Sequence, residues 1–197
     1  MRLAYFDFNN NFGGAPQSMA HLVQRLAARH EVRVFDAYGR CAPYRAFFDS
    51  AGIPFEVALP DARRRFIGGK GLGRWVALLR QLPELLRLRR CLIARLTAYD
   101  PDLIWVMNEK SLTFVGTSRK LRTTPIAHFV QGWATPDQVN WRLRKLLRRR
   151  VAAVLAVSAA TAERLRQAGV PSGKVYAIGS TVDFDAVRAR AAQPPDP

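Results

Sequence analysis

The chain has 197 residues, 49% of them hydrophobic. This length and composition suit one globular domain with a sizeable core and exclude a largely disordered chain. Its 31 Lys and Arg against 15 Asp and Glu give a net charge of +16, which predicts an anionic partner: nucleic acid, an anionic membrane surface or a phosphorylated substrate. Two cysteines and three histidines show no zinc-binding spacing, so we expect no metal and no cofactor.

Short apolar segments, rich in β-branched and aromatic residues, alternate along the chain with segments of helical periodicity. They predict seven buried strands: Leu3–Phe8, Val32–Phe35, Phe55–Leu59, Leu103–Met107, Ile126–Val130, Val151–Val157 and Val175–Ile178. The first helical segment places Met19, Val23 and Leu26 on one face. Alternating strands and helices favour a parallel sheet covered on both sides. The expected fold class is α/β, a Rossmann-like three-layer domain with a mostly parallel sheet of about seven strands.

The first strand and the first helix are joined through Gly13 and Gly14. Glycines before a helix let a ligand approach backbone N–H groups, and the helix dipole favours an anion such as phosphate. The spacing is neither GxGxxG nor a Walker loop, which disfavours a redox dinucleotide or a P-loop ATPase. Two interpretations stay open: the pair, with Gln17 in the next turn, contacts a phosphate or sugar, or it only makes a tight turn.

Further candidates follow the other predicted strands, because ligands of open α/β sheets bind outside the carboxyl ends of the strands. Asn108 and Lys110 after the fourth strand are candidates for contact with a hydroxyl or phosphate group, whereas Ser111 is typical of an N-terminal helix cap. Gln131 and Trp133 follow the fifth strand. Trp133 either stacks on a sugar face or closes the loop over the core.

Six of the nine residues from Arg142 to Arg150 are basic, and an apolar stripe that includes Leu143 and Leu147 runs through them. This pattern predicts an amphipathic helix that packs its stripe on the sheet. A cationic face can also attract anionic lipid, at ~1 kcal/mol per Lys or Arg. The candidate membrane-surface residues are Arg142, Arg144, Lys145, Arg148 and Arg149. A second group is expected on the same positive surface: Arg87, Arg89, Arg90 and Arg95.

Three passages, in this order, resemble family 4 of the GT-B glycosyltransferases. The first is FNNNFGGAPQSMAHLVQRLAARHEVRVF, similar to the family's strand, Gly-Gly turn, long helix and Ala-x-x-His-Glu-Val segment. The second is YDPDLIWVMN, similar to its Pro-Asp-apolar-apolar-His strand. The third is VLAVSAATAERLRQAGVPSGKVYAIGSTVD, similar to its Val-Ser, Gly-Val-Pro, Lys-Val and Val-Asp passage.

The resemblance implies a glycosyltransferase that moves a sugar from a nucleotide-sugar donor to a hydroxyl acceptor with retention. Residues 1–182 would be its N-terminal, acceptor-binding domain, and residues 183–197 a linker or tail. The donor would bind mainly to a second domain, with a Glu-x7-Glu signature, that we expect to be absent from this chain. The chain would then be an excised domain or a natural half, inactive alone, and its acceptor a lipid-linked sugar or a polysaccharide precursor.

The chain departs from the family pattern at Gln131, where the family often has a histidine at the end of the fifth strand. Glutamine exchanges hydrogen bonds but cannot act as a general base, so the catalytic residues remain unassigned. His128 lies three residues earlier, which in a strand means the opposite face. We therefore expect His128 to be a packed structural residue.

The alternative class is a non-catalytic basic module for anionic ligands or nucleic acid. The charge fits nucleic acid, but no zinc-finger spacing, RNP motif or helix-turn-helix is present, so this partner is disfavoured. The segment after Met1 has the alternation of a strand and contains Asp7. It therefore lacks the apolar region and the cleavage site of a signal peptide. We expect a cytoplasmic protein, with peripheral attachment to the inner face of the membrane as a further hypothesis.

Overall fold

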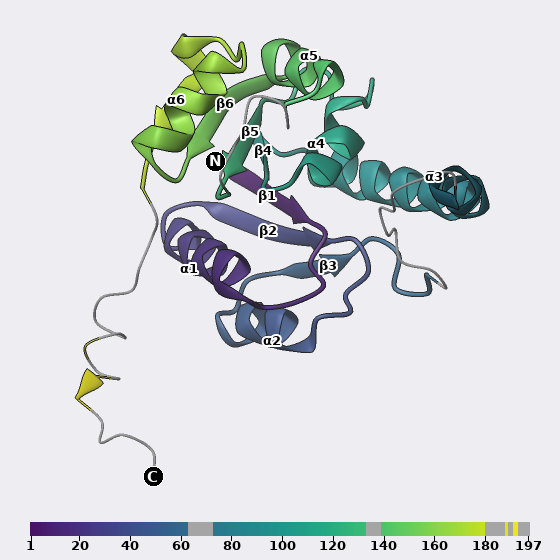
Figure 1. Ribbon diagram of the computed structural model, residues 1–197. Helices are drawn as coiled ribbons and strands as arrows, with labels where there is room; N and C mark the ends of the chain where they lie inside the picture. The colour runs from purple at the N-terminus through teal and green to yellow at the C-terminus, as the bar shows by residue number, and fades with distance from the viewer. Residues whose placement is uncertain (63–72, 133–138, 180–187, 189–190, 193–197) are drawn as a thin grey trace.

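A computed structural model describes residues 1–62, 73–132, 139–179, 188 and 191–192 (Figure 1). The strands form one sheet in the order β3-β2-β1-β4-β5-β6-β7, and all six neighbouring pairs are parallel. This sheet confirms the predicted α/β fold and each of the seven predicted strands.

The strands are β1 (Arg2–Asp7), β2 (Glu31–Asp36), β3 (Phe55–Val57), β4 (Leu103–Val106), β5 (Ile126–Val130), β6 (Val151–Ala156) and β7 (Val175–Ala177). The helices are α1 (Gly14–Ala27), α2 (Ala42–Ser50), α3 (Gly73–Tyr99), α4 (Glu109–Gly116), α5 (Trp141–Arg149) and α6 (Ala159–Gln167). A short 3-10 helix, η1 (Ser172–Lys174), precedes β7.

Both faces of the sheet are buried, and each has its own core. Along β1, Leu3 and Tyr5 belong to one core, while Ala4 and Phe6 belong to the other. Helices α1 and α2 pack on the Tyr5 side, and α3, α4, α5 and α6 pack on the Phe6 side. Because successive strand residues point to opposite faces, this division makes the three layers of the predicted fold.

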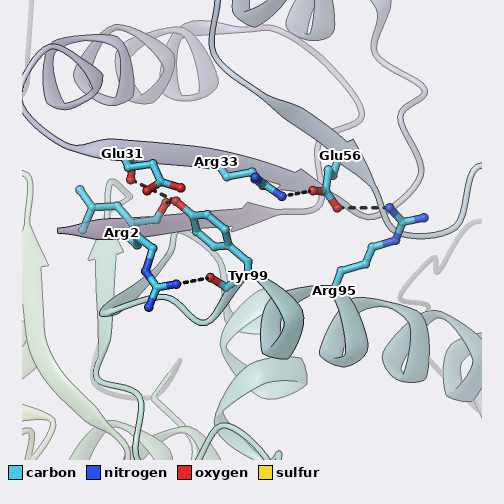
Figure 2. A network of polar contacts seen from close by, with 7 residues as sticks. Arg2, Glu31, Arg33, Glu56, Arg95 and Tyr99 are labelled. Atoms are coloured by element: carbon cyan, nitrogen blue, oxygen red, sulfur yellow. Dashed lines mark hydrogen bonds and ion pairs between the residues drawn. The ribbon is translucent and has the colours of Figure 1, made fainter.

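Polar contacts fasten the end of α3 to the strands beside it (Figure 2). The Tyr99 hydroxyl donates to the Glu31 carbonyl at 3.1 Å, and the Arg33 guanidinium lies 4.5 Å from the centre of the Tyr99 ring. Glu56 on β3 accepts from Arg33 at 2.7 Å and from Arg95 of α3 at 3.2 Å. These contacts hold the C-terminal part of α3 where the chain can turn directly into β4, next to β1.

A second fastening point is Arg150, which directly follows α5. Its guanidinium donates to the backbone carbonyls of Gly116 at 3.1 Å, Leu121 at 2.7 Å and Arg122 at 2.6 Å. A helix leaves its last carbonyls without intrahelical partners. Arg150 therefore satisfies the end of α4 and the loop after it, and it ties α4 to α5.

Replacing Arg150 with alanine should lower the free energy of unfolding by about 1–3 kcal/mol, because three carbonyls lose a charged hydrogen-bond donor. Arg149→Ala is the matched control, since Arg149 is exposed and should change stability by no more than about 0.5 kcal/mol. Urea unfolding of both variants measures the difference. Equal unfolding midpoints for the two variants would show that the Arg150 contacts do not stabilise the fold.

Candidate functional site

The sheet changes direction between β1 and β4. From β1 the chain continues through α1 to β2 on one side, and it returns through α3 to β4 on the other side of β1. Helices α1 and α3 lie on opposite faces. In open α/β sheets, ligands bind outside the carboxyl ends of the strands at this kind of switch point. The candidate site therefore lies at the ends of β1 and β4.

The Asp7 carboxylate at the end of β1 occupies this switch point and is 1% exposed. Its Oδ1 accepts hydrogen bonds from the Phe8 N–H at 2.8 Å, from the Ser111 hydroxyl at 3.1 Å and from the Asn108 side-chain amide. Its Oδ2 lies 3.4 Å from the Tyr5 hydroxyl. One carboxylate thus joins the loop after β1 to the beginning of α4.

Asn108 is the N-cap of α4, and its side-chain oxygen accepts from the Ser111 N–H at 2.8 Å. The expectation that Ser111 is the cap is therefore wrong, because Ser111 lies in the first turn and donates its hydroxyl to Asp7 instead. Asn108 is only partly buried, but both ends of its amide already have protein partners. Any contact of Asn108 with a ligand must share these bonds or replace them.

Asp36 fixes the chain at the end of β2, as Asp7 does at the end of β1. It is 2% exposed at the end of β2, and its carboxylate accepts from the N–H groups of Asn9 at 3.2 Å, Tyr38 at 3.1 Å and Gly39. The bond to Asn9 links the loop after β1 to the loop after β2. The chain segments that follow β1, β2 and β4 are thus all held by buried carboxylates.

Burial changes the acidity of this cluster. It raises the pKa of Asp7 from 3.8 to about 6, and the charge of Asp36 adds to the rise while hydrogen bonds from Phe8 and Ser111 oppose it. Burial also raises the pKa of Asp36, and it raises the pKa of Tyr44 well above 10.0. Folding therefore favours protonated forms here, since a low-dielectric site disfavours charge.

Two more polar groups border the acids. The Asn9 amide nitrogen and the Tyr44 hydroxyl are buried close to each other, and among the described residues neither makes a hydrogen bond of good geometry. Buried polar groups normally have partners, so such atoms commonly mark a place for water or a ligand group. The sequence argument missed this cluster, although one signal was available: the first two buried strands each end in Asp.

Gly13 and Gly14 begin α1 with an open helix end. Gly13 is the N-cap and has extended backbone, with φ −82° and ψ −171°, and no side chain caps the helix. A Cβ added at either glycine would meet nothing within 4 Å. Neither backbone conformation nor packing within the described residues requires these glycines. Gln17 is exposed, and its amide donates back to the Phe12 carbonyl at 2.8 Å.

Two of the remaining predicted site residues, Lys110 and Gln131, lie along the same edge of the sheet. Lys110 is exposed in the first turn of α4. Gln131 directly follows β5, the neighbour of β4, and its side-chain oxygen is buried and has no hydrogen-bond partner among the described residues. Trp133 lies outside the described residues. The structure thus brings Asn108 against Asp7 and places Gln131 at the end of the adjacent strand.

His128 does not belong to this site. It is 4% exposed within β5, and burial lowers its pKa from 6.5 to about 4, opposed by a hydrogen bond with the Val106 backbone. A histidine in this state is neutral at physiological pH. The expectation of a packed structural residue is confirmed.

The basic helix α5 packs as its pattern predicts. Leu143 and Leu147 are buried, and the cations proposed for a membrane surface are all exposed: Arg142, Arg144, Lys145, Arg148 and Arg149. Trp141 is 67% exposed, and the Arg142 guanidinium lies 5.3 Å from its ring centre. None of the described helices combines the length and the apolar character that a membrane crossing requires.

The second basic group, expected on one positive surface, divides in two. Arg87 pairs with Asp61 at 2.7 Å, and Arg95 pairs with Glu56 at 3.2 Å. Arg89 and Arg90 instead line a cavity on another side of α3. The two pairs meet different neighbours of α3: Arg87 and Arg95 reach carboxylates of β3 and the chain after it, whereas Arg89 and Arg90 adjoin the loop after α4.

Asp7→Asn should change how stability depends on pH. The variant keeps an oxygen for the three bonds that converge on Oδ1 and removes the titration. Because the folded pKa of Asp7 is raised, the wild type loses stability as pH rises from about 4 to about 6. We expect the variant to gain about 3 kcal/mol over the wild type across this window, measured by urea unfolding at each pH.

The difference between the two proteins isolates Asp7 from His128. Since the folded pKa of His128 is lowered, its contribution has the opposite sign and increases as pH rises from about 4 to 6.5. That contribution is present in both proteins and cancels. A difference that stays flat, or that favours the wild type at higher pH, would contradict the buried, proton-holding carboxylate.

Comparison with solved structures shows which proteins share this fold. Anabaena HepE, solved with UDP and glucose, matches 97% of this chain with 49% of its own, at 18% identity and a TM-score of 0.66. The lipopolysaccharide outer core galactosyltransferase WaaB matches 92% of this chain with 46% of its own, at 14% identity and 0.62. The UDP-GlcNAc 2-epimerase from Neisseria meningitidis, bound to UDP-GlcNAc, matches 98% with 51%, at 16% identity and 0.61.

The chain therefore spans about half the length of these proteins, and at such identities the likeness shows the fold alone. No curated protein sequence matches the chain. The family model described as Glycosyltransferase Family 4 matches residues 12–186. This match covers both glycines at the start of α1, the chain after β4 and the last strand of the sheet, and it shows that the chain belongs to glycosyltransferase family 4.

Proposed function

We propose that this chain is the acceptor-binding half of a glycosyltransferase that moves a sugar from a nucleotide-sugar donor to a hydroxyl acceptor. The observation that carries the proposal is the switch point between β1 and β4, where polar groups and the open end of α1 lie along one edge of the sheet. HepE and WaaB, which share the fold, are about twice as long as this chain. The donor then binds mainly to a second domain.

The groups at the carboxyl edge suit a hydroxyl-bearing ligand. Gln131 has a side-chain oxygen without a hydrogen-bond partner among the described residues, and the Asn9 amide and the Tyr44 hydroxyl lie beside each other next to the buried acids. These neutral donors and acceptors match sugar hydroxyls, each of which can donate one hydrogen bond and accept two. The open N-terminus of α1 adds backbone N–H groups that can approach a ligand oxygen or a phosphate.

Three candidates for proton transfer at this edge are poorly placed for it. Gln131 cannot act as a base, His128 is buried within the sheet, and the oxygens of Asp7 are enclosed by donors of the protein itself. General base catalysis requires a group within hydrogen-bond reach of the proton it removes. A domain of this kind binds and orients an acceptor, and we propose that it transfers no sugar alone. A retaining transfer, as in the family it resembles, is compatible with this site.

The domain limits belong to this proposal as well. Residues 1–182 would form the acceptor domain and residues 183–197 the linker or tail. The boundary between them lies outside the described residues. The last described strand, β7, ends at Ala177 and pairs with β6, so every described strand lies within the proposed acceptor domain.

A lipid-linked acceptor at the inner face of the membrane is the specific form we propose. The support is α5, whose buried stripe leaves a row of cations and Trp141 in solvent. Exposed tryptophan beside arginine is typical of protein surfaces that contact lipid headgroups. Attachment of this kind would be peripheral, and it would bring the edge of the sheet close to a membrane-bound substrate.

Gly13→Val tests the acceptor site. The purified wild-type chain should give saturation-transfer NMR signals with methyl hexosides and should release no UDP from UDP-glucose. The variant should lose most of the hexoside signal, because its side chain fills the space before α1 that is now open. Gly173→Val is the matched control, since a Cβ there also meets nothing within 4 Å and η1 lies before β7, away from the site. Equal signals from both variants, or UDP release by the chain alone, would overturn the proposal.

Charge reversal on α5 tests membrane attachment. Arg148→Glu with Arg149→Glu should reduce co-sedimentation with phosphatidylglycerol vesicles several-fold, and added salt should weaken wild-type binding, because exposed charges are screened over about 10 Å at 0.1 M. Arg25→Glu with Arg29→Glu changes the net charge equally on the opposite side of the sheet. If this control reduces binding as much, net charge rather than α5 drives the association.

A further inference from the structure

A cavity of about 430 Å³ lies between α3 and the loop after α4, at the end of α4 far from Asn108. Four cationic side chains line it: Arg89 and Arg90 from α3, and Arg119 and Lys120 from the loop. The hydroxyl residues Thr117 and Ser118 also contribute, and none of the described residues that line the cavity is acidic. Such a lining is strongly positive and rich in hydrogen-bond donors.

The protein neutralises other arginines of the same helix but leaves these unpaired. Arg87 and Arg95 each pair with a carboxylate, and Figure 2 shows Arg95 reaching Glu56. Among the described residues, no ion pair joins Asp or Glu to any of the four cations of the cavity. Their charge is therefore available to bind an anionic ligand.

One local feature opposes anion binding, and the structure offsets it. The C-terminal end of a helix carries roughly half a negative charge, and this cavity adjoins the end of α4. Arg150 already donates to the carbonyls of Gly116, Leu121 and Arg122 at that end. Because Arg150 neutralises these carbonyls from the α5 side, the four cavity cations are not needed to satisfy them.

Arg89 is also held in position. Its Nη2 donates to the Thr117 hydroxyl at 3.0 Å, and that hydroxyl donates to the Thr113 carbonyl at 2.7 Å. A guanidinium that is oriented before binding loses less conformational freedom when a ligand arrives. Planar guanidinium groups match the paired oxygens of phosphate, and a neighbouring lysine adds a point charge.

We propose that this cavity binds a phosphoryl group, carried either by a lipid headgroup or by a soluble phosphate. The site is separate from the carboxyl edge of the sheet and does not depend on the function proposed there. A larger cavity of about 570 Å³ shares Thr117 and is lined by residues of α4 and α5, among them Glu109, Arg142, Leu143, Lys145, Leu146 and Arg149. The phosphoryl group thus lies beside a groove in which an attached apolar chain can lie.

The test uses the full chain with two probes. Inorganic pyrophosphate, titrated by calorimetry, represents the soluble source, and phosphatidylcholine vesicles with and without phosphatidic acid represent the lipid source. Arg90→Ala with Arg119→Ala should weaken binding of the effective probe by roughly tenfold. Arg87→Ala with Arg95→Ala is the matched control, because it removes the same charge from paired side chains and should change binding less than twofold. Thermal unfolding confirms that both variants fold.

The outcomes separate the two sources and can overturn the site. Pyrophosphate binding that the Arg90 and Arg119 variant weakens supports a phosphoryl site open to soluble ligands. Binding that is weakened only for phosphatidic acid vesicles supports a headgroup site. An equal loss in both double variants, no loss in either, or no wild-type binding of either probe would overturn the proposal. Hexoside binding at Gly13 should persist in both variants, so failure here is distinguishable from failure of the acceptor site.

Discussion

The carboxylate of Asp7 is the interaction on which the edge of this sheet depends. It is buried where β1 ends, and donors from Phe8, Asn108 and Ser111 converge on one of its oxygens. β1 lies between β2 and β4. Asp7 therefore fixes both the loop after β1 and the start of α4, and these two segments lead to helices on opposite faces of the sheet. Asp36 acts in the same way at the end of β2, and it also accepts a hydrogen bond from the Asn9 N–H in the loop after β1. The backbone around the switch point is thus held in place by two buried carboxylates.

The distribution of charged side chains over the surface is a second feature of the structure, and the net charge alone does not show it. The excess of 16 positive charges is not spread evenly. The carboxylates of Glu56 and Asp61 neutralise arginines of β2 and α3. The exposed cations of α5 and those of the α3–α4 cavity have no carboxylate partner among the described ion pairs. On the side of the sheet that carries α3, α4 and α5, cations without a described carboxylate partner therefore form two groups, one on α5 and one around the cavity.

Sequence reasoning predicted the fold well and the candidate site in part. The seven strands were found because fully buried parallel strands are short apolar runs, a signal that needs no knowledge of partners. Asn108 and Gln131 were located at the correct edge for the same reason. The acidic pair was missed because the pairing of Asp7 with Asn108 and Ser111 spans about a hundred residues of chain. No local pattern encodes that contact, and an Asp at a strand end is also common in turns.

By itself the sequence determined the order of strands and helices, the buried faces and the family resemblance, since periodicity and ordered motifs are local properties. Only the tertiary structure decided which strand lies beside which, and hence where the switch point falls. It also decided which arginines are paired: Arg87 and Arg89 are two residues apart and chemically identical, yet one meets Asp61 and the other lines a cavity. The physical reason is that pairing depends on what the fold brings opposite a helix face, which local sequence does not specify.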